Sequence, residues 1–345
     1  MRAIVLVGGQ GTRLRPLTWR SPKALVPVLN RPLLEHLLLH LKRHDINRIT
    51  LAMTQRNADI RDAFGDGSAL GIELEYAYED TPLGSGGAIA SIAQGWEESF
   101  LVANGDIITD LDLTAMYAFH REHGAELTMH LHEVDDPSQF GVAVTAEDGR
   151  ITTFVEKPPL ETAPSKLINA GNWLFEPSTI RGLSPTEFNR VEDGLFPQLC
   201  EAERPIFGFS LPSYWRDIGN SEALLQVNLE LVADAIPGRV SADTNGVLVG
   251  AGATIDAAAR LNAPAVIGEG ARIGREATVE RSVCWDGVIL EDGATVRDSI
   301  VASGATVGAG ATIERSVVAH GARIAAGARL TDQQVEPDSQ IEAAS

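Results

Sequence analysis

The sequence has 345 residues, of which 44% are hydrophobic, and its 47 acidic side chains outnumber its 28 lysines and arginines to give a formal net charge of −19. This length exceeds the size at which one hydrophobic core usually stops growing, so we expect a globular protein with two domains. The acidic balance argues against a general affinity for nucleic acid or anionic membranes, and any anionic ligand must be held by a local cluster of cations.

The chain begins with MRAIVLVGGQ, in which a short apolar run meets glycines at once. That run is too brief for a signal peptide or a membrane span, so a cytoplasmic location is expected. Only Cys200 and Cys284 are present, far apart and without CxxC spacing. Both are interpreted as buried thiols rather than as parts of a zinc site or a disulfide.

Residues 1–235 alternate short β-rich runs with amphipathic stretches, which is typical of an α/β domain with a mostly parallel, Rossmann-like sheet. The predicted strands are Ala3–Val7, Arg48–Ala52, Ile72–Tyr76 and Phe100–Ala103. The predicted helices are Pro32–Arg43, Ala58–Phe64, Ser85–Ala93 and Ser221–Ala235. Right-handed crossovers would bring the carboxyl ends of the strands to one edge, where ligands bind in such sheets.

The first predicted strand runs into the loop GGQGTRLRPLT, which is followed by SPKAL. Its glycines Gly8, Gly9 and Gly11 let backbone N–H groups approach a polyphosphate closely. Residues 1–34 hold six basic side chains and no acidic one, where the average density of the chain predicts roughly three and roughly five. The loop breaks the GxGxxG pattern at Leu14 and lacks the GK[ST] ending of a P-loop, so both of those phosphate-binding motifs are excluded.

This loop and the PK dipeptide that ends at Lys23 resemble the signature of the nucleoside-diphosphate-sugar pyrophosphorylases, GGxGTRLxPLT followed by PK. The resemblance implies a magnesium-dependent sugar-1-phosphate nucleotidyltransferase, which joins a nucleoside triphosphate to a sugar 1-phosphate and releases pyrophosphate. It also implies that the loop, from its glycines to Thr12, wraps the triphosphate. Arg13 and Lys23 would then act on the phosphates and on the pyrophosphate leaving group.

The segment TPLGSGGAIA is predicted to begin a helix at the nucleobase end of this site. Small residues and backbone groups there can approach the edges of a base, and the residues concerned are Leu83, Gly84, Ser85, Gly86 and Gly87. They are more similar to the LGTAGA or LGTGGA versions of guanylyltransferases than to the LAQA version of thymidylyltransferases. Synthesis of GDP-mannose is therefore the first expectation, with glucose 1-phosphate and dTTP, ATP or UTP as alternatives.

Two aspartates are candidate metal ligands. Asp106 ends an NGD motif that follows the strand at 100–103, and Asp217 follows the aromatic run in YWRDIG. Mg²⁺ commonly takes one or two protein carboxylates together with phosphate oxygens and water. The resemblance implies that this pair binds the ion, although either aspartate could instead cap a glycine-containing turn.

Three motifs would line the sugar phosphate pocket in that family. FVEKP places Glu156 and Lys157 at the end of a strand, INAGNW places Asn169 and Gly171 at the start of another, and QFGVAV contains Gly141. The resemblance implies that the lysine binds the phosphate, that the glutamate binds sugar hydroxyls, and that the asparagine and the glycines lie next to the sugar. Two of the four lysines of the chain fall on motif positions, which a solvated face would not explain.

After a predicted linker at residues 236–246, aliphatic residues recur every six positions, at Val249, Ile255, Leu261, Ile267, Ile273 and Val279. The spacing then slips to five, six, six, and a 17-residue period relates Val279, Val296, Ile313 and Leu330. Three short strands per coil predict a parallel β-helix over residues 247–330, and the resemblance to hexapeptide-repeat proteins implies the left-handed form. Its flat faces favour self-association into a homo-oligomer. Residues 331–345 are predicted to form a loose tail or a cap.

Two other functions are compatible with the sequence. A regulatory homologue would bind a nucleotide-sugar without turning it over, although the intact candidate residues argue against decay. The β-helix could instead transfer an acyl group, a reaction that usually needs a histidine, and His320 is the only histidine in the repeats. The stripe at His36, His40 and His44 is interpreted as structural, because the same spacing occurs on any helix face.

Overall fold

A computed structural model describes residues 1–54, 58–233, 236 and 245–343 of the protein. Residues 1–8 and 37–215 form one compact unit, and residues 9–36 and 216–345 form the other. The glycine-rich loop therefore belongs to the unit that contains the C-terminal repeats. The predicted boundary at residue 235 stays a prediction, and the predicted linker lies mostly outside the described residues.

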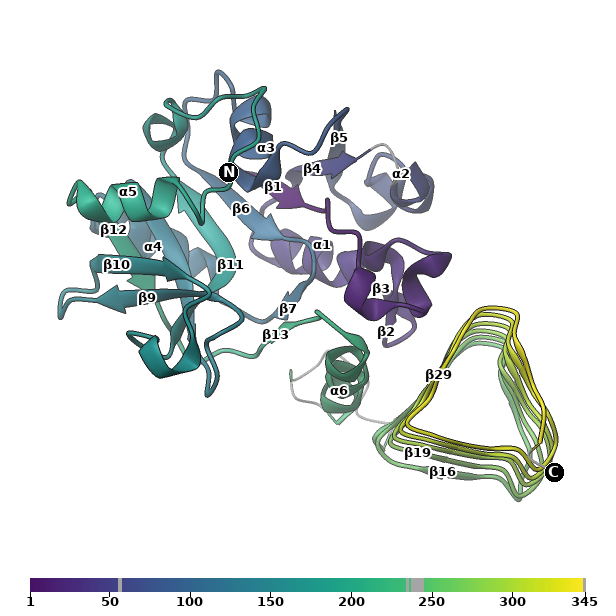
Figure 1. The fold of residues 1–345 in the computed structure, drawn as a ribbon. Helices are drawn as coiled ribbons and strands as arrows, with labels where there is room; N and C mark the ends of the chain where they lie inside the picture. The colour runs from purple at the N-terminus through teal and green to yellow at the C-terminus, as the bar shows by residue number, and fades with distance from the viewer. Residues whose placement is uncertain (55–57, 234–235, 237–244, 344–345) are drawn as a thin grey trace. The chain divides into compact units, whose positions relative to one another are not determined.

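The first unit is built around a nine-stranded mixed sheet (Figure 1). Its parallel part contains, in spatial order, β5 (Glu73–Glu79), β4 (Arg48–Thr54), β1 (Arg2–Leu6) and β6 (Phe100–Asn104). Its other strands are β8 (Leu127–Glu133), β9 (Gly141–Thr145), β10 (Ile151–Glu156), β11 (Leu167–Phe175) and β12 (Ile206–Phe209). The four predicted strands are confirmed, with small shifts at their ends.

The expectation of a mostly parallel sheet needs correction. Strand β11 pairs antiparallel with β6, β8 and β9, and β10 pairs antiparallel with β9. Between β8 and β11 the chain forms no α-helix, and a parallel neighbour would need such a crossover. In the parallel part, by contrast, Ala3, Ile4 and Val5 of β1 are fully buried, as expected for a strand covered on both faces.

The helices are α1 (Leu33–Arg43), α2 (Ala58–Phe64), α3 (Gly84–Ile92), α4 (Leu113–Glu122), α5 (Leu195–Glu201) and α6 (Ser221–Val232). Side-chain caps begin two of them: Asp112 accepts a hydrogen bond from the Ala115 N–H at 2.9 Å, and Asn220 accepts one from the Ala223 N–H at 2.8 Å. Among the described residues, no helix combines the length and the apolar character that a membrane crossing requires. Short strands outside the large sheet are β2 (Pro27–Val28), β3 (Arg31–Pro32), β7 (Ile107–Thr109) and β13 (Trp215–Asp217).

The C-terminal repeats form a parallel β-helix whose coils have a triangular cross-section in Figure 1. The first β-helix sheet contains β14 (Val247–Val249), β17 (Ala265–Ile267), β20 (Val283–Cys284), β23 (Ile300–Val301), β26 (Val317–Val318) and β29 (Gln334–Val335). The second contains β15 (Thr254–Ile255), β18 (Arg272–Ile273), β21 (Ile289–Leu290), β24 (Thr306–Val307), β27 (Arg323–Ile324) and β30 (Gln340–Ile341). The third contains β16 (Arg260–Asn262), β19 (Thr278–Glu280), β22 (Thr295–Arg297), β25 (Thr312–Glu314) and β28 (Arg329–Thr331). These stacked sheets confirm the predicted β-helix and are consistent with its left-handed form.

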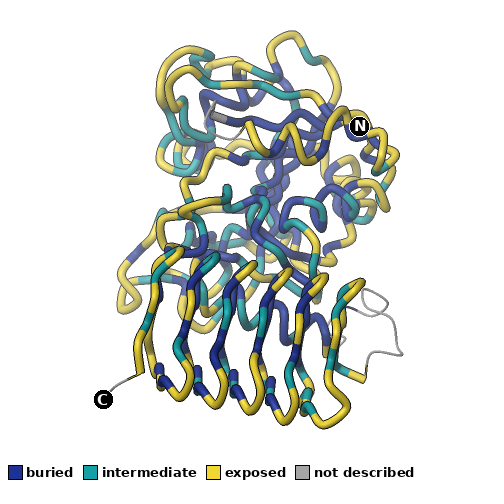
Figure 2. Tube along the Cα trace, turned by 90° about the vertical axis from the view of Figure 1, so that its right-hand side faces the viewer, coloured by how far each residue is buried: buried dark blue, intermediate teal, exposed yellow. Residues whose placement is uncertain are grey.

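The register of the coils follows the repeat of the sequence. Val279 pairs with Val296, and Val296 pairs with Ile313, so these partners are one 17-residue period apart. Figure 2 shows buried residues at corresponding places in successive coils. Strands β29 and β30 lie after residue 331 and pair with β26 and β27, so residues 334–341 continue the coils instead of forming a loose tail.

One corner of the β-helix carries charged residues where the other corners carry mostly glycines. Arg281, Asp298, Arg315 and Asp332 all have a positive φ. The Arg281 Nε atom lies 2.8 Å from an Asp298 oxygen, and the Arg315 Nε atom lies 2.9 Å from an Asp332 oxygen. The recurring RSV and DSI tripeptides thus place opposite charges one coil apart.

A ladder of buried serines runs beside this corner. The Ser299 N–H donates to the Ser282 hydroxyl at 3.1 Å, and the Ser316 N–H donates to the Ser299 hydroxyl at 3.0 Å. Each hydroxyl satisfies a backbone group of the next coil that would otherwise be buried without a partner.

Candidate active site

The glycine-rich loop folds back on itself so that Gly11 lies against Lys23. Gly11 has a φ of 59°, and a Cβ at this position would lie 3.1 Å from the Lys23 Cβ and 3.1 Å from the Thr18 Cγ2. The Thr18 hydroxyl donates a hydrogen bond to the Gly11 carbonyl at 2.8 Å. A larger residue would be strained by both the left-handed backbone and these neighbours, so glycine is required for this approach.

The residues around this glycine are open to a ligand. Thr12 and Arg13 are exposed on a short 3₁₀ turn that the fully buried Leu14 anchors. A Cβ on Gly8 or Gly9 would meet no atom within 4 Å. The backbone there is free of side-chain cover, which close approach of a polyphosphate requires.

Arg13 and Asp217 both lie beside Gly219. A Cβ on Gly219 would be 2.8 Å from the Asp217 Oδ2 and 3.2 Å from the Arg13 Nη2. Asp217 ends β13, and the fully buried Ile218 follows it. The fold therefore brings together the arginine expected to act on phosphates and one of the two expected metal ligands.

The other expected metal ligand, Asp106, lies in the tight turn between β6 and β7 and is half-buried. The Gly105 N–H donates to the Leu6 carbonyl at 3.0 Å, and a Cβ on Gly105 would lie 3.0 Å from that oxygen. Glycine lets the turn pack against β1, which fixes Asp106 at the carboxyl end of the parallel strands. It belongs to the first compact unit, whereas Asp217 belongs to the second.

The donor set suits an ion that shares its ligands with phosphates. In the described parts of the chain, His, Cys, Asp and Glu side chains form no group of three or more that could hold a metal. A closed protein cage of the zinc type is therefore not built there. Single carboxylates such as Asp106 and Asp217 fit Mg²⁺, which takes its remaining ligands from phosphate and water.

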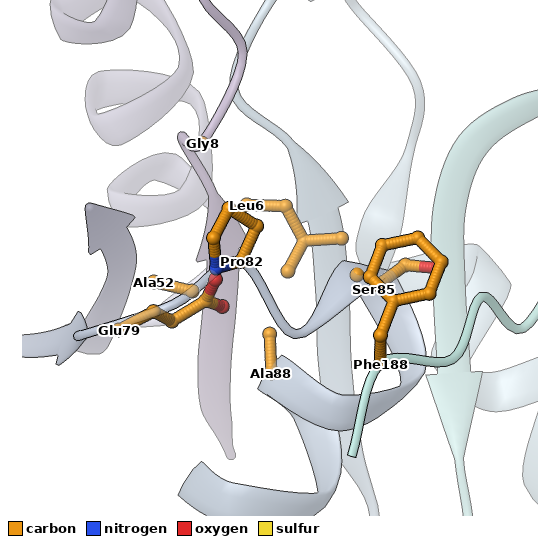
Figure 3. A pocket seen from close by; sticks show the side chains of 9 residues that line it. Leu6, Gly8, Ala52, Glu79, Pro82, Ser85, Ala88 and Phe188 are labelled. Carbon is orange, nitrogen blue, oxygen red and sulfur yellow. The ribbon is translucent and has the colours of Figure 1, made fainter. Parts of the chain in front are cut away.

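A cavity of about 230 Å³ lies at the amino end of α3 (Figure 3). Its lining is mostly apolar and consists of Leu6, Gly8, Ala52, Glu79, Pro82, Gly84, Ser85, Ala88 and Phe188. The one carboxylate, Glu79, has its pKa raised by burial, and the Leu83 N–H, which donates to Glu79 Oε2 at 3.0 Å, opposes this shift. Apolar walls with one aromatic ring and one acceptor group suit a flat heterocycle.

The glycines of the LGSGG segment make room for a strap at residues 187–192. A Cβ on Gly84 or Gly86 would collide with Asn189. The Asn189 N–H donates to the Leu83 carbonyl at 2.9 Å, and the Gly86 N–H donates to the Asn189 carbonyl at 3.0 Å. Gly84 lines the cavity, whereas Leu83 and Gly86, predicted to approach the base, are engaged with the strap.

Of the residues that line this cavity, only Gly8, Gly84 and Ser85 were predicted to bind the nucleotide, and the missed ones include its carboxylate and its aromatic ring. Glu79 ends β5, and no motif marked it as a ligand-binding residue. Phe188, with 66% of its surface exposed, reaches the cavity because the strap is fixed to α3, where the Ser85 hydroxyl donates to Glu192 at 2.6 Å. An aromatic side chain left this exposed was a signal only once the fold was known.

Among the residues expected to line the sugar phosphate pocket, Glu156 lies close to two cations. It lies 3.1 Å from the Arg190 Nη2 and 3.7 Å from the Lys157 Nζ, and burial raises its pKa despite these partners. A Cβ on Gly141 would lie 2.9 Å from the Glu156 Oε2, so glycine leaves room for this carboxylate. Lys157 has a φ of 46° and its N–H donates to the Phe140 carbonyl at 3.0 Å, an uncommon conformation that tends to occur at functional positions.

The INAGNW motif lies directly against the NGD motif. The Asn169 Oδ1 accepts hydrogen bonds from the Trp173 Nε1 at 2.7 Å and from the Gly171 N–H at 3.1 Å, which fixes its orientation. Gly171 has a φ of 74°, and a Cβ there would lie 2.7 Å from the Asn104 Nδ2. The structure thus joins the expected sugar-side residues to the strand end that carries Asp106.

The histidines in and directly after α1 make structural contacts. His36 donates to the Val28 carbonyl at 2.8 Å, and the rings of His40 and His44 pack edge to face with centroids 5.0 Å apart. Elsewhere, burial lowers the pKa of His130 to about 3. These environments support the structural interpretation of the stripe.

The two cysteines are poor nucleophiles. Burial raises the pKa of Cys284 to about 12 and that of the half-buried Cys200 to about 11. Neither thiol is therefore ionised near neutral pH, where only the thiolate reacts.

Comparison with known proteins decides the family. The nucleotidyl transferase profile matches residues 2–234, and the profile of the GMPPB C-terminal domain matches residues 244–345. The chain belongs to the nucleotidyl transferase family. As a nucleotidyl transferase it is an enzyme, and members of the family generally use a divalent metal ion.

Relatives of this nucleotidyl transferase differ in their substrates. A mannose-1-phosphate guanylyltransferase from Mycobacterium tuberculosis is 37% identical over 84% of this chain and 81% of its own length. A UTP–glucose-1-phosphate uridylyltransferase from Synechocystis is 34% identical over 64% of this chain and 60% of its own length. Among solved structures, HddC from Yersinia pseudotuberculosis complexed with GMP-PN has a TM-score of 0.57 and 25% identity, covering 67% of this chain and 99% of that one.

Proposed function

We propose that the protein is a mannose-1-phosphate guanylyltransferase, which joins GTP to mannose 1-phosphate and releases pyrophosphate. The observation that carries this proposal is the folded loop, in which Gly11 lies against Lys23 and Arg13 lies beside Asp217. The chain has a net charge of −19, yet this loop brings backbone amides and cations together. Such a cluster suits a triphosphate. The relative from M. tuberculosis supports this choice of substrates.

The reaction requires two anions to be held in line, and the chain offers cations for both. The second pKa of a phosphate monoester is about 6, so the sugar phosphate is already an anionic nucleophile near neutral pH and needs no general base. Its oxygen attacks the α-phosphorus opposite the pyrophosphate. Lys157 would bind the sugar phosphate, while Arg13 and Lys23 would neutralise the triphosphate and the leaving group.

We further propose that the divalent ion is Mg²⁺ and that Asp106 and Asp217 hold it. When bound, such an ion neutralises the charge that develops on the phosphate oxygens. The chain contributes the position of the two carboxylates: Gly219 leaves room for that of Asp217, and Gly105 lets the turn that carries Asp106 pack against β1.

Glu79 supports guanine as the base. Guanine presents two adjacent donors, N1–H and N2–H₂, which one carboxylate can accept together. Uracil and thymine place their N3–H between two carbonyl oxygens, which would repel a carboxylate. Phe188 offers a ring face on which a base can stack.

Pyrophosphate release with ATP, GTP, CTP, UTP and dTTP, each paired with mannose or glucose 1-phosphate, tests the proposal. We expect the highest kcat/KM with GTP and mannose 1-phosphate. A preference for UTP or dTTP with glucose 1-phosphate would contradict the substrate assignment. No turnover with any pair would indicate a regulatory homologue that only binds nucleotide-sugars.

Substitution of Glu79 tests the base assignment separately. We expect Glu79→Gln to lower kcat/KM for GTP by roughly 10- to 100-fold, because the amide cannot accept from both guanine donors. Activity with UTP should fall less or rise. Glu73→Gln, at an exposed position of the same strand, is the control.

A further inference from the structure

The first β-helix sheet has an apolar outer face that is covered. Val266, Val283 and Ile300 alternate with residues of the interior core and so point outward, yet at most 1% of each is exposed. Outward positions of the other two sheets are mostly polar, as at Arg272 and Thr295, and remain at least partly exposed. One face of the β-helix is therefore an internal interface of the second compact unit.

Residues 9–36 and α6 belong to this unit and contact the first sheet at its early coils. The Asn30 side chain donates to the Ile267 carbonyl of β17 at 2.7 Å. The neighbouring Leu29 N–H donates to the Oδ1 of Asn228 in α6 at 2.8 Å, and Asn228 is only 1% exposed. These bonds fix the turn between β2 and β3 from both sides.

The last coils hold the middle of the same segment. His320 Nε2 donates to the carbonyl of the fully buried Leu17 at 3.2 Å, and the His320 ring lies 5.4 Å from the ring of the buried Trp285. Arg20 forms an ion pair with Asp338. The β-helix thus binds the segment in its early coils and again in its final ones.

Leu17 and Arg20 lie in the stretch of chain between Arg13 and Lys23, the two cations assigned to the triphosphate. We propose that the last coils position this stretch for catalysis, with Arg20, Asp338 and His320 as positioning residues that touch no substrate. The early contacts fix the segment after Lys23, and the late contacts fix the part before it. The spacing of the two cations then depends on the β-helix. This inference rests on the proposed nucleotidyl transfer.

A matched pair of variants tests the inference. Asp338 and Asp332 both pair with an arginine and have similarly exposed side chains, 59% and 65%, but the Asp332 pair lies wholly within the β-helix. We expect Asp338→Ala to raise KM for GTP roughly two- to fivefold, the scale of one exposed ion pair, and to leave KM for mannose 1-phosphate unchanged. Asp332→Ala should alter neither value.

A charge swap separates positioning from general damage. The double variant Arg20→Asp/Asp338→Arg should return KM for GTP towards the wild-type value. This double variant and Asp338→Ala should both keep the wild-type melting temperature. An unchanged KM for GTP in Asp338→Ala, or an equal rise in both KM values, would overturn the inference. Absence of turnover by the wild-type enzyme with every triphosphate would instead overturn the proposed function.

Discussion

The β-helix and the nine-stranded sheet specify their structures in different ways. In the β-helix each residue meets its counterpart one coil away, as Val279 meets Val296, so the same environment recurs along the chain. In the sheet, β11 joins β6, β8 and β9, and each pairing occurs once. A single substitution in the repeats should therefore have a small effect on stability or activity. A single substitution among the unique contacts that build the active site should have a large effect on activity.

The sharpest test of this contrast is Asp106→Asn. We expect kcat to fall by about 10²–10³-fold or more, because the amide keeps the shape of the side chain but loses the charge that an Mg²⁺ ligand needs. Pyrophosphate release at several Mg²⁺ concentrations measures the loss. The same change at Asp298, in the charged corner of the β-helix, should leave kcat unaltered, and retained activity in Asp106→Asn would refute the metal assignment.

Lys157→Ala should have the next largest effect. We expect KM for mannose 1-phosphate to rise roughly 10- to 100-fold while KM for GTP stays constant, because only one of the two anions loses its cation. Steady-state kinetics with each substrate varied in turn gives both values. Lys166→Ala is the control, since this exposed lysine pairs with Asp135 at 3.2 Å; similar kinetics in the two variants would remove the assignment.

Within the β-helix core, Ile313→Val should cost about 0.5–1.5 kcal/mol of the free energy of unfolding, because one buried methylene is lost. Ile313 is fully buried in a cluster that repeats from coil to coil. Urea unfolding followed by circular dichroism measures the cost, and kcat should not change. A large loss of activity at unchanged stability would break the proposed contrast between the two regions.

The smallest effect is expected at the charged corner. Arg281→Ala removes an exposed ion pair with Asp298, so stability should change by about 0–1 kcal/mol and the difference should shrink in high salt. Thermal unfolding at low and high salt checks this. A loss that is insensitive to salt would show that the arginine acts through packing instead.

Periodicity explains why so much of the β-helix was predictable. A 17-residue spacing of aliphatic residues defines both the strands and their partners, because every inward position must repeat in register. The antiparallel half of the large sheet was not predicted, since the pairing of hairpin partners such as β9 and β10 produces no repeating pattern in the sequence. The final coil was missed because Gln334 and Gln340 stand where earlier coils carry mostly Val, Ile, Thr or Arg.

The candidate active site likewise combines residues that are contiguous in sequence with residues that are far apart. The glycine-rich loop could be singled out from the sequence as a candidate anion-binding loop, because its glycines and cations are contiguous. The cavity at the amino end of α3 could not be predicted, since Phe188 reaches it from a strap whose Glu192 is 107 residues from its partner Ser85. Contacts between residues so far apart in the sequence depend on the assembled fold. The presence of a phenylalanine or a glutamate does not predict them.

The bond between Leu17 and His320 joins residues 303 positions apart. At about 5–20 residues per second, roughly 15–60 s of translation separate their emergence from the ribosome. The nascent chain therefore carries its glycine-rich loop without the contact to His320 until the last coils are made. A product released early by a premature stop codon keeps the signature sequence and lacks the partner that holds it.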